Sequence, residues 1–344
     1  MRAVIMRELG RLELANVPEP VVSADDEVKV KVKAVGICGT DLHMFCEARE
    51  DVVLPRIMGH ELSGVVTEVG SGVSRVKIGD SVVLDPVFAC GVCPTCQKGY
   101  PNVCERVRCY GVQMDGGLQD YIVVKEEHLY PYKDSIPFVH AALAEPFSIA
   151  FNIVQRLQVK KEDKVLILGS GTIGLSLLQV VKSLGTYTVV ADKIDEKLAI
   201  AGEMGANETV NSDRECLKSA AEHLSGSGFD VILDAAGLTS LLEEAFTYAA
   251  PRARISCIGF EEAPAQIPPA WITRKELSVI GSRMNCHQFP TVMKWLEEGK
   301  INAGKMISRQ YPVRDIQRAF TETLADRTGS IKTVIVFDEE EEGR

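Results

Sequence analysis

The sequence predicts an α/β protein with a β-rich domain and a second domain built on a doubly wound parallel sheet. Short strands with alternating apolar and charged residues occupy roughly the first 150 residues. From there to about residue 280, apolar strands alternate with helical segments, which is typical of βαβ units. A chain of 344 residues, 46% of them hydrophobic, is long enough for about two domains with sizeable cores.

The β-rich domain contains Val28–Ala34, in which apolar residues alternate with lysines. This period of two predicts a strand with one face in water. Glycine-containing turn signals separate the short apolar segments that follow. Further strands are expected at residues 64–69, 81–84 and 121–124. Together these segments predict a meander or a barrel.

The second domain begins with Lys164–Leu168, a continuous apolar run that predicts a strand buried on both faces of a parallel sheet. Helical periodicity follows over Ile173–Leu184, and Tyr187–Ala191 is expected to form the next strand. A helix is expected over Asp195–Met204. Further strands are expected at residues 229–234, 253–258 and 277–280. This alternation predicts the doubly wound sheet.

The last part of the chain departs from this alternation. Amphipathic helices are expected at residues 287–298 and 316–324, and a closing strand at 331–337. We expect this part to pack back on the first domain. The predicted domains are therefore residues 1–148 with 283–344, and residues 149–282. The acidic run Asp338–Glu342 is expected to be a solvated tail without a function.

The charge and the cysteine content exclude several classes of function. The net charge of −10 disfavours binding to nucleic acid or to anionic membranes. The apolar core of the N-terminus is too short for a secretory signal, and no apolar run is long enough to span a membrane. In such a chain, ten cysteines indicate metal binding or catalysis rather than disulfides. The expected compartment is a reducing cytoplasm.

Four cysteines lie within one short segment, residues 90–104. Cys90, Cys93, Cys96 and Cys104 have the spacing C-x2-C-x2-C-x7-C. This spacing lets four thiolates converge on one tetrahedral Zn²⁺, with no position left open for a substrate. The alternative is a chance cluster of buried thiols, since unpaired cysteines are often buried.

A glycine-rich turn follows the first strand of the second domain. Gly169, Gly171 and Gly174 form the pattern G-x-G-x-x-G between a strand and a helix, which is the context that a dinucleotide requires. Asp192 ends the next strand, where a carboxylate can bind the adenosine ribose and repel a 2′-phosphate. NAD is therefore favoured over NADP, although Lys193 adjoins Asp192 and weakens this inference. The alternative is a structural turn without a ligand.

A second metal site is indicated by Cys38, in Gly36-Ile-Cys-Gly-Thr-Asp-Leu-His43, and by His60 and Glu61. A thiolate, an imidazole and a carboxylate form a mixed ligand set, which is typical of a catalytic zinc with an open position. Each segment taken alone is ambiguous, because a single cysteine or histidine is more often a structural residue.

With these features the chain resembles the zinc-containing medium-chain alcohol and polyol dehydrogenases over essentially its whole length. Gly59-His60-Glu61, followed by Gly64, Gly70 and Val73, matches the zinc signature of that family. The four-cysteine loop and the dinucleotide turn follow in the family's order. The resemblance implies a GroES-like catalytic domain, a Rossmann cofactor domain, zinc and NAD as cofactors, and a homodimer or homotetramer.

The resemblance also implies roles for particular residues. Cys38 and His60 would bind the catalytic zinc, with Glu61 as a ligand or an exchanging carboxylate. Glu145 matches the third zinc ligand of the sorbitol and threonine dehydrogenases, bound directly or through water. Thr40 and His43 match the family's proton relay. Further cofactor contacts would come from Thr172, Ile173, Lys193, Lys197, Ala235, Gly259 and Phe260.

Asp41 is a candidate to orient His60, although it could also be an ordinary turn aspartate. Gly39 replaces a basic residue of some alcohol dehydrogenases, so one contact to the cofactor phosphate is expected to be absent.

The substrate is indicated by Arg283 and Asn285, which border the substrate and nicotinamide in the family. A guanidinium can bind a carboxylate through two hydrogen bonds, but it can also bind a hydroxyl or the cofactor, or simply form an ion pair at a domain boundary. In finer detail, Pro251–Ile255, Arg274–Leu277 and Phe289-Pro290 resemble a bacterial subgroup with the starvation-sensing dehydrogenase and sugar-acid 5-dehydrogenases.

We therefore expect a zinc- and NAD-dependent sugar-acid dehydrogenase. The leading candidate reaction is the oxidation of L-gulonate to D-fructuronate, and the next candidate substrates are L-idonate and L-galactonate. One alternative is a dehydrogenase of a neutral polyol, butanediol or threonine. An alternative of another class is a regulatory protein that binds NAD(H) with little turnover.

Overall fold

The computed structural model describes residues 1–326 and 328–337. The acidic run Asp338–Glu342 lies outside the described residues. The chain divides into two compact units, Met1–Glu145 with Asn285–Arg344, and Pro146–Met284. Each unit is described by itself.

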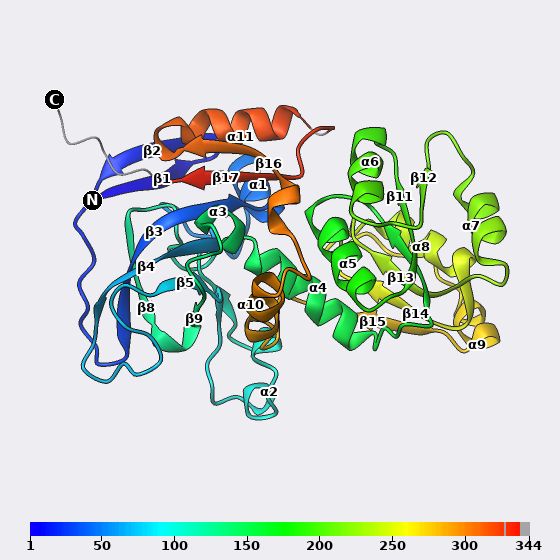
Figure 1. Ribbon diagram of the computed structural model, residues 1–344, viewed down its shortest axis with the longest axis horizontal. Helices are drawn as coiled ribbons and strands as arrows, with labels where there is room; N and C mark the ends of the chain where they lie inside the picture. The colour runs from blue at the N-terminus through cyan, green and yellow to red at the C-terminus, as the bar shows by residue number, and fades with distance from the viewer. Residues whose placement is uncertain (327, 338–344) are drawn as a thin grey trace. The chain divides into compact units, whose positions relative to one another are not determined.

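The first unit contains a seven-stranded mixed sheet with the order β16-β17-β3-β4-β5-β9, in which β8 also pairs with β3 (Figure 1). The predicted strands are confirmed. The strands of this sheet are β3 (Glu27–Ile37), β4 (Glu61–Val69), β5 (Ser81–Leu84), β8 (Tyr121–Lys125), β9 (Leu129–Pro131), β16 (Ile307–Pro312) and β17 (Lys332–Val336). The long β3 pairs with three neighbours, β17, β4 and β8, so it organises the sheet.

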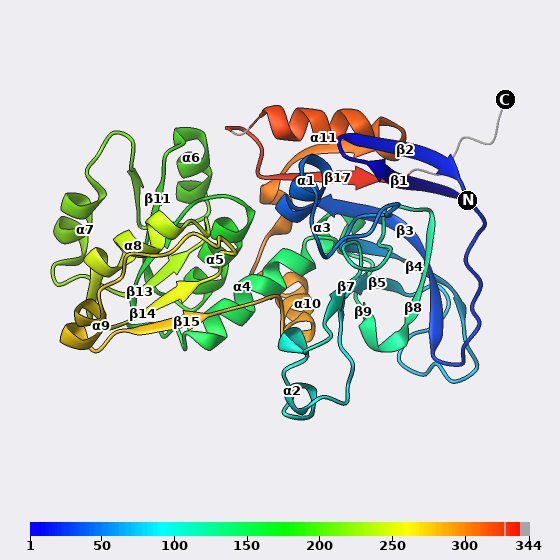
Figure 2. The same cartoon turned by 180° about the vertical axis from the view of Figure 1, so that it is seen from behind.

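Smaller elements surround this sheet. Two antiparallel strand pairs are β1 (Arg2–Glu8) with β2 (Arg11–Asn16), which form a hairpin, and β6 (Val87–Phe88) with β7 (Arg108–Cys109). The helices of this unit are α1 (Gly39–Cys46), α2 (Pro94–Gln97), α3 (Phe138–Ala141), α10 (Phe289–Glu297) and α11 (Ile316–Ala325), with the 3₁₀ turns η1 (Pro101–Val103), η2 (Glu126–His128), η3 (Ala303–Met306) and η4 (Val313–Asp315). Figure 2 shows α11 lying along β17 and β2.

The core of the first unit explains why the chain's end returns to its beginning. Val30 and Val35 of β3 are fully buried, and Phe320 of α11 packs in the same cluster. The ring of Phe320 lies 5.3 Å from that of Phe45 on α1. Burying such side chains stabilises the fold by about 1.5–3 kcal/mol each. The helix predicted at residues 316–324 thus covers apolar surface of the first unit.

The second unit is built on a six-stranded parallel sheet with the order β12-β11-β10-β13-β14-β15. Its strands are β10 (Lys164–Leu168), β11 (Tyr187–Asp192), β12 (Glu208–Asn211), β13 (Phe229–Asp234), β14 (Ala249–Cys257) and β15 (Ser278–Gly281). Its helices are α4 (Ala144–Arg156, which starts in the first unit), α5 (Thr172–Ser183), α6 (Asp195–Glu203), α7 (Leu217–Ser225), α8 (Thr239–Tyr248) and α9 (Pro269–Lys275). In the predicted apolar run Lys164–Leu168, Lys164 is exposed and the four residues that follow are buried.

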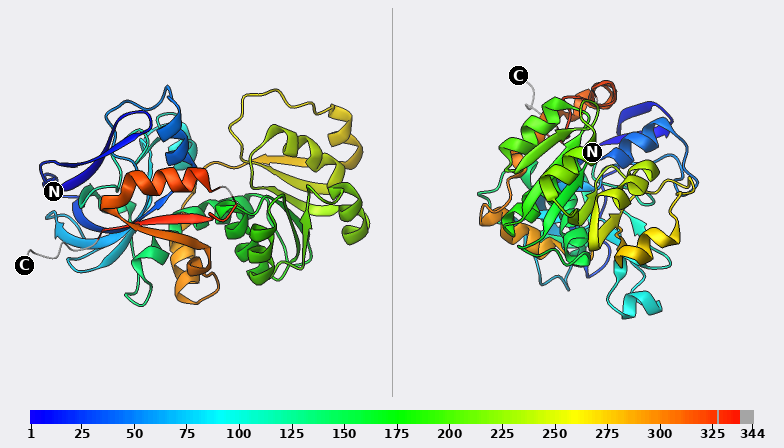
Figure 3. Two further views of the ribbon diagram at one scale, coloured as in Figure 1. Left: turned by 90° about the horizontal axis from the view of Figure 1, so that it is seen from above. Right: turned by 90° about the vertical axis from the view of Figure 1, so that its right-hand side faces the viewer.

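The strand order reverses its direction at β10, from which β11 and β12 extend one way and β13 to β15 the other. Because crossover connections are right-handed, helices cover both faces of such a sheet (Figure 3). This confirms the predicted doubly wound architecture. Ligands of such sheets bind beyond the carboxyl ends of the strands at the reversal point, which here follows Leu168.

Among the described residues, no helix combines the length and the apolar character that crossing a lipid bilayer would need.

Candidate metal centres and cofactor site

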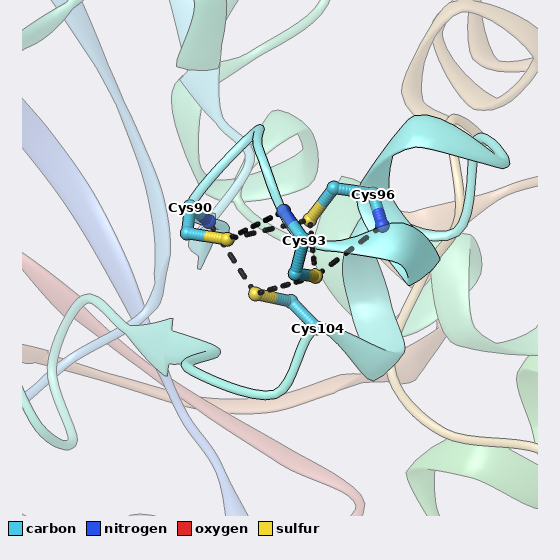
Figure 4. A group of neighbouring side chains, drawn as sticks. All are labelled: Cys90, Cys93, Cys96 and Cys104. Atoms are coloured by element: carbon cyan, nitrogen blue, oxygen red, sulfur yellow. Dashed lines mark hydrogen bonds between the residues drawn. The ribbon is translucent and has the colours of Figure 1, made fainter.

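The four cysteines of residues 90–104 converge on one point (Figure 4). The Sγ atom of Cys93 lies 3.5 Å from that of Cys96 and 3.9 Å from that of Cys104, and the Sγ atoms of Cys90 and Cys96 are 4.0 Å apart. Tetrahedral zinc with Zn–S bonds of about 2.3 Å sets its sulfur atoms about 3.8 Å apart. The group therefore fits a structural zinc, and all four thiols are free of disulfides.

Backbone amides hold these sulfur atoms in place. The N–H of Cys93 donates to Sγ of Cys90 at 3.3 Å, and the N–H of Cys96 donates to Sγ of Cys93 at 3.5 Å. Such bonds favour the thiolate, and the amides of Val92 and Cys93 lower the pKa of Cys90 to about 6. Cys93 also caps α2, so the short helix and the metal group form one local structure.

The second group combines Cys38, His60 and Glu61, whose ligand atoms all lie within 4.8 Å of one another. Cys38 is the N-cap of α1, and His60 and Glu61 stand at the start of β4. His60 is 5% exposed and Glu61 is 1% exposed. These donors fit a zinc ion with a free coordination position, as the sequence predicts.

Asp41 is a buried carboxylate whose side chain faces Nδ1 of His60. It is 1% exposed, and its Oδ2 accepts a hydrogen bond from the N–H of Cys38 at 2.9 Å. Its Oδ1 lies 3.7 Å from Nδ1 of His60, and neither of these two buried atoms has another partner. Burial alone lowers the pKa of His60, but the charges of Asp41 and Cys38 raise it well above its usual value. This arrangement suits a carboxylate that orients a metal-binding imidazole.

Besides belonging to the candidate metal group, Glu61 forms an ion pair with Lys332, which the sequence analysis missed. Nζ of Lys332 donates to both carboxylate oxygens of Glu61, at 2.7 and 2.8 Å, and to the carbonyl oxygen of Ile37 at 3.0 Å. The side chain of Lys332 is 2% exposed. A single lysine within the apolar segment Ile331–Phe337 was the available signal. Its partner could not be read from the sequence, because it is far away in the chain.

Glu145 lies in the first turn of α4 and is 9% exposed. Burial raises its pKa to about 7, and the charge of His60 acts in the opposite direction. Glu145 is thus within electrostatic reach of the second metal group, but its carboxylate does not belong to the set within 4.8 Å. Direct ligation would require the side chain to move toward the other ligands.

Thr40 and His43 lie three residues apart on α1 and therefore share one face of the helix. Thr40 is half-buried and His43 is exposed. A path from a partly buried hydroxyl to an exposed imidazole has the direction that a proton relay to water needs.

The glycine turn has the geometry that a pyrophosphate requires. Gly169 has a φ of +99°, which other residues rarely adopt. A Cβ atom on Gly171 would meet nothing within 4 Å, so the backbone there faces open space, whereas one on Gly174 would lie 2.0 Å from the carbonyl oxygen of Gly169. The turn opens α5 at Thr172 and Ile173, whose N-terminal amides favour an anion.

The other predicted cofactor residues follow the carboxyl ends of the parallel strands. Lys193 and Lys197 follow β11, Ala235 follows β13, and Gly259 and Phe260 follow β14. Phe260 is 78% exposed in this unit. Asp192 is the last residue of β11, as predicted.

The two predicted substrate residues have different surroundings. Arg283 is exposed and belongs to the second unit. Asn285 belongs to the first unit, is 1% exposed, and donates from Nδ2 to Oδ1 of Asp85 at 2.9 Å. Asp85 was missed by the sequence analysis, and its charge contributes to the raised pKa of Glu145.

Fold and sites together define a zinc- and NAD-dependent dehydrogenase of alcohols, with a structural and a catalytic metal centre. The family description "Alcohol dehydrogenase GroES-like domain" matches residues 24–134, and "Zinc-binding dehydrogenase" matches residues 172–298. The chain belongs to this zinc-type alcohol dehydrogenase family.

Two relatives illustrate the range of the family. The starvation-sensing protein RspB of Escherichia coli K12 is 37% identical over 345 residues, which cover 98% of this chain and 100% of RspB. D-arabitol-phosphate dehydrogenase of Enterococcus avium is 31% identical over 95% of this chain and 93% of its own length.

Two solved structures are similar throughout. RspB from E. coli CFT073, an alcohol dehydrogenase complexed with NADH, has a TM-score of 0.92 and 37% identity over 98% of this chain and 99% of that chain. L-idonate 5-dehydrogenase from E. coli K-12 has a TM-score of 0.89 and 26% identity over 98% of both chains.

The Cys93→Ser substitution is expected to remove roughly one zinc per chain and to lower the melting temperature, because the cysteine segment is held together by its metal. Metal analysis and thermal unfolding measure both effects. Cys257→Ser, at a cysteine outside both groups, is the control. An unchanged zinc content in Cys93→Ser would contradict the structural zinc.

The Cys38→Ser substitution is expected to reduce turnover at least about a thousandfold, since Lewis-acid stabilisation contributes several kcal/mol. NADH binding, followed by fluorescence, is expected to persist because the cofactor turn is in the other unit. Loss of NADH binding together with global unfolding would show that Cys38 is a structural residue.

The Lys332→Met substitution is expected to lower the free energy of unfolding by about 3–5 kcal/mol, because it leaves the buried charge of Glu61 unpaired. Adding Glu61→Gln is expected to restore most of this loss. Denaturant unfolding measures both variants. The control is Lys29→Met, because Lys29 lies in the same sheet but pairs with the half-exposed Glu19 and Glu68. A loss no greater than that of the control would contradict the role of the pair.

Proposed function

We propose that this alcohol dehydrogenase oxidises a secondary alcohol of a sugar acid with NAD, and that L-gulonate to D-fructuronate is the leading reaction. The observation that carries the proposal is the full-length similarity to L-idonate 5-dehydrogenase, whose name states a sugar acid and position 5. L-Gulonate and L-idonate are both six-carbon aldonates, so one pocket shape serves either with small changes. L-Idonate and L-galactonate are the next candidates.

Each chemical task of such an oxidation has a candidate residue in the chain. When bound, zinc would lower the pKa of a substrate hydroxyl and NAD would accept the hydride. Cys38, His60 and a carboxylate from Glu61 or Glu145 would hold the metal, and Asp41 would keep the His60 ring in place. The Thr40 hydroxyl both accepts and donates a hydrogen bond, so it can pass a proton toward His43.

Arg283 supports an acidic substrate. It is an exposed arginine two residues after β15, near the change from one unit to the other. Its planar guanidinium matches a carboxylate through two parallel hydrogen bonds, which a lysine or an amide does not reproduce. We propose that it binds the substrate carboxylate, which neutral polyols lack.

A neutral polyol is the second candidate, and one observation favours it. The Asn285 amide is already bonded to Asp85, a carboxylate close enough to Glu145 for its charge to raise the pKa of that residue. A carboxylate within electrostatic reach of Glu145 accepts hydrogen bonds from hydroxyls and repels an anion. Butanediol and threonine remain further alternatives within the enzyme class.

A regulatory NAD(H)-binding protein is the alternative from another class. Such a protein needs the glycine turn and Asp192 but needs neither the Cys38 group nor a proton relay. The presence of the mixed ligand group therefore supports turnover. We further propose a cytoplasmic homodimer or homotetramer, which fits the ten free thiols and the family.

A substrate screen with zinc-loaded protein and NAD tests the proposal, with NADH formation followed by absorbance. The panel contains L-gulonate, L-idonate, L-galactonate, D-mannonate, sorbitol, threonine and butanediol, and Cys38→Ser is the blank. We expect kcat/KM to be at least about tenfold higher for one aldonate than for any neutral alcohol, since charge-assisted pairing contributes about 1.5–3 kcal/mol.

The Arg283→Gln variant separates the candidate substrates. It is expected to raise KM for aldonates about tenfold and to leave neutral alcohols nearly unchanged. Arg274→Gln, at an exposed arginine of α9 in the same unit, is the control. Faster oxidation of sorbitol or butanediol than of every aldonate would overturn the sugar-acid proposal. Two zincs and tight NADH binding without any turnover would favour the regulatory protein.

A further inference from the structure

The loops after β11 and β12 form one cross-linked cluster. Asp192 and Asn211 are paired at the ends of these strands. The Asn211 side chain, 8% exposed, donates to Oδ1 of Asp195 at 2.6 Å and to the carbonyl oxygen of Lys193 at 3.2 Å. Its Oδ1 accepts from the N–H of Asp213 at 3.0 Å. The side chains that follow both strands are therefore held in a fixed arrangement.

Within this cluster the Asp192 carboxylate is held by four donors. Oδ2 accepts from the N–H and the Oγ of Ser170 at 2.6 and 2.7 Å. Oδ1 accepts from the N–H groups of Lys193 and Ile194 at 2.7 and 3.1 Å. Ser170 is fully buried within the glycine turn. The turn that receives the pyrophosphate thus also orients the carboxylate that faces the adenosine ribose.

Two cations beside Asp192 have acidic partners. Nζ of Lys193 lies 3.7 Å from Oδ1 of Asp213, and the guanidinium of Arg214 forms an ion pair with Asp195. The side chains of Lys193, Asp213 and Arg214 are mostly exposed and that of Asp195 is 45% exposed, so the two pairs contribute little to folding stability. The two pairs would instead change the affinity for a phosphate ligand, because a cation that is already paired is less available to bind it.

We infer that Asp195 and Asp213 are specificity-determining residues for NAD over NADP, and that Ser170 is a positioning residue for Asp192. The 2′-phosphate of NADP needs cations at the end of the second strand of the sheet. Lys193 and Arg214 are in the right region of the chain, but their acidic partners hold them. Repulsion by the fixed Asp192 carboxylate acts in addition. Lys193 weakens the sequence-based inference that NAD is preferred over NADP. Its pairing with Asp213 offsets that positive charge.

The inference predicts that replacing Asp192 alone is insufficient to admit a 2′-phosphate. The test compares Asp192→Asn with the triple variant that also carries Asp195→Asn and Asp213→Asn. Each change preserves side-chain shape and removes one charge. Binding of 2′,5′-ADP and of 5′-AMP is measured by calorimetry, and binding of NADPH and NADH by fluorescence. These measurements need no substrate, so they are independent of the proposed sugar-acid activity.

The triple variant is expected to bind 2′,5′-ADP about tenfold more tightly than Asp192→Asn does, because charge-assisted bonds from two released cations reach the phosphate. Affinity for 5′-AMP is expected to differ less than about threefold between the two variants. Adding Lys193→Gln and Arg214→Gln to the triple variant is expected to abolish the gain.

The control for net charge is Glu276→Gln in the Asp192→Asn background. Glu276 lies just before β15 and pairs with the exposed Arg252 of β14. The strand β15 is the edge of the sheet opposite to β12. Asp195→Asn and Asp213→Asn are also added one at a time to Asp192→Asn. If the control changes 2′,5′-ADP binding as much as either of these additions does, the effect is general electrostatics and the inference is wrong. A gain below about twofold in the triple variant also overturns it.

Ser170→Ala tests the positioning role separately. It removes the Oγ donor and keeps the backbone donor. We expect affinity for 5′-AMP to fall a few-fold while affinity for 2′,5′-ADP does not fall, so that the ratio of the two narrows. An equal loss for both nucleotides would indicate a merely structural serine.

Discussion

The buried ion pair between Lys332 and Glu61 is the interaction on which the first unit's candidate active site depends. It joins β17, near the end of the described chain, to the start of β4, where His60 also stands. Both side chains are almost completely inaccessible to water, so each charge would be costly without the other. The last strand therefore contributes to the metal group as well as to the sheet. The pairing also affects Glu145: beyond the effect of burial, the charge of Glu61 raises the pKa of Glu145 and the charge of Lys332 lowers it.

The neighbouring strand β3 makes room for this pair. A Cβ atom on Gly36 would lie 2.1 Å from Oε2 of Glu61, so a side chain at position 36 would displace the carboxylate. The register supplies the rest, because Gly36 pairs with Glu61 on one side and with Val334 on the other. A missing side chain in the central strand thus lets a carboxylate and an ammonium from its two neighbours meet beside Ile37. The same glycine begins the segment that leads to Cys38, so metal ligand and carboxylate are positioned by one stretch of β3.

Features that depend on local sequence could be predicted, and features that depend on distant register could not. The glycine turn, Asp192 and the four cysteines were visible because each is defined within a short segment of known geometry. The hairpin of β1 and β2 was missed, as were α4 and β16, whose patterns are weak without their tertiary neighbours. Lys332 was not connected to Glu61, and Asp85 was not connected to Asn285, because 271 and 200 residues separate the partners. No local spacing encodes such pairs, since they exist only after the segment that begins at Asn285 has joined the first unit.

The two metal groups accordingly depend on the fold to different extents. The cysteine group is assembled from one short segment, with its own backbone amides as donors and its own helix turn, so it needs little beyond the metal. The Cys38 group takes its ligands from the N-cap of α1 and the start of β4, and its charge balance from β17. It can therefore form only when the sheet is complete. A site formed by one short segment tolerates changes elsewhere in the chain. The Cys38 group, in contrast, depends on the packing of α1, β4 and β17 within the first unit. The candidate catalytic group thus depends on the assembled first unit, whereas the cysteine group depends on one short segment.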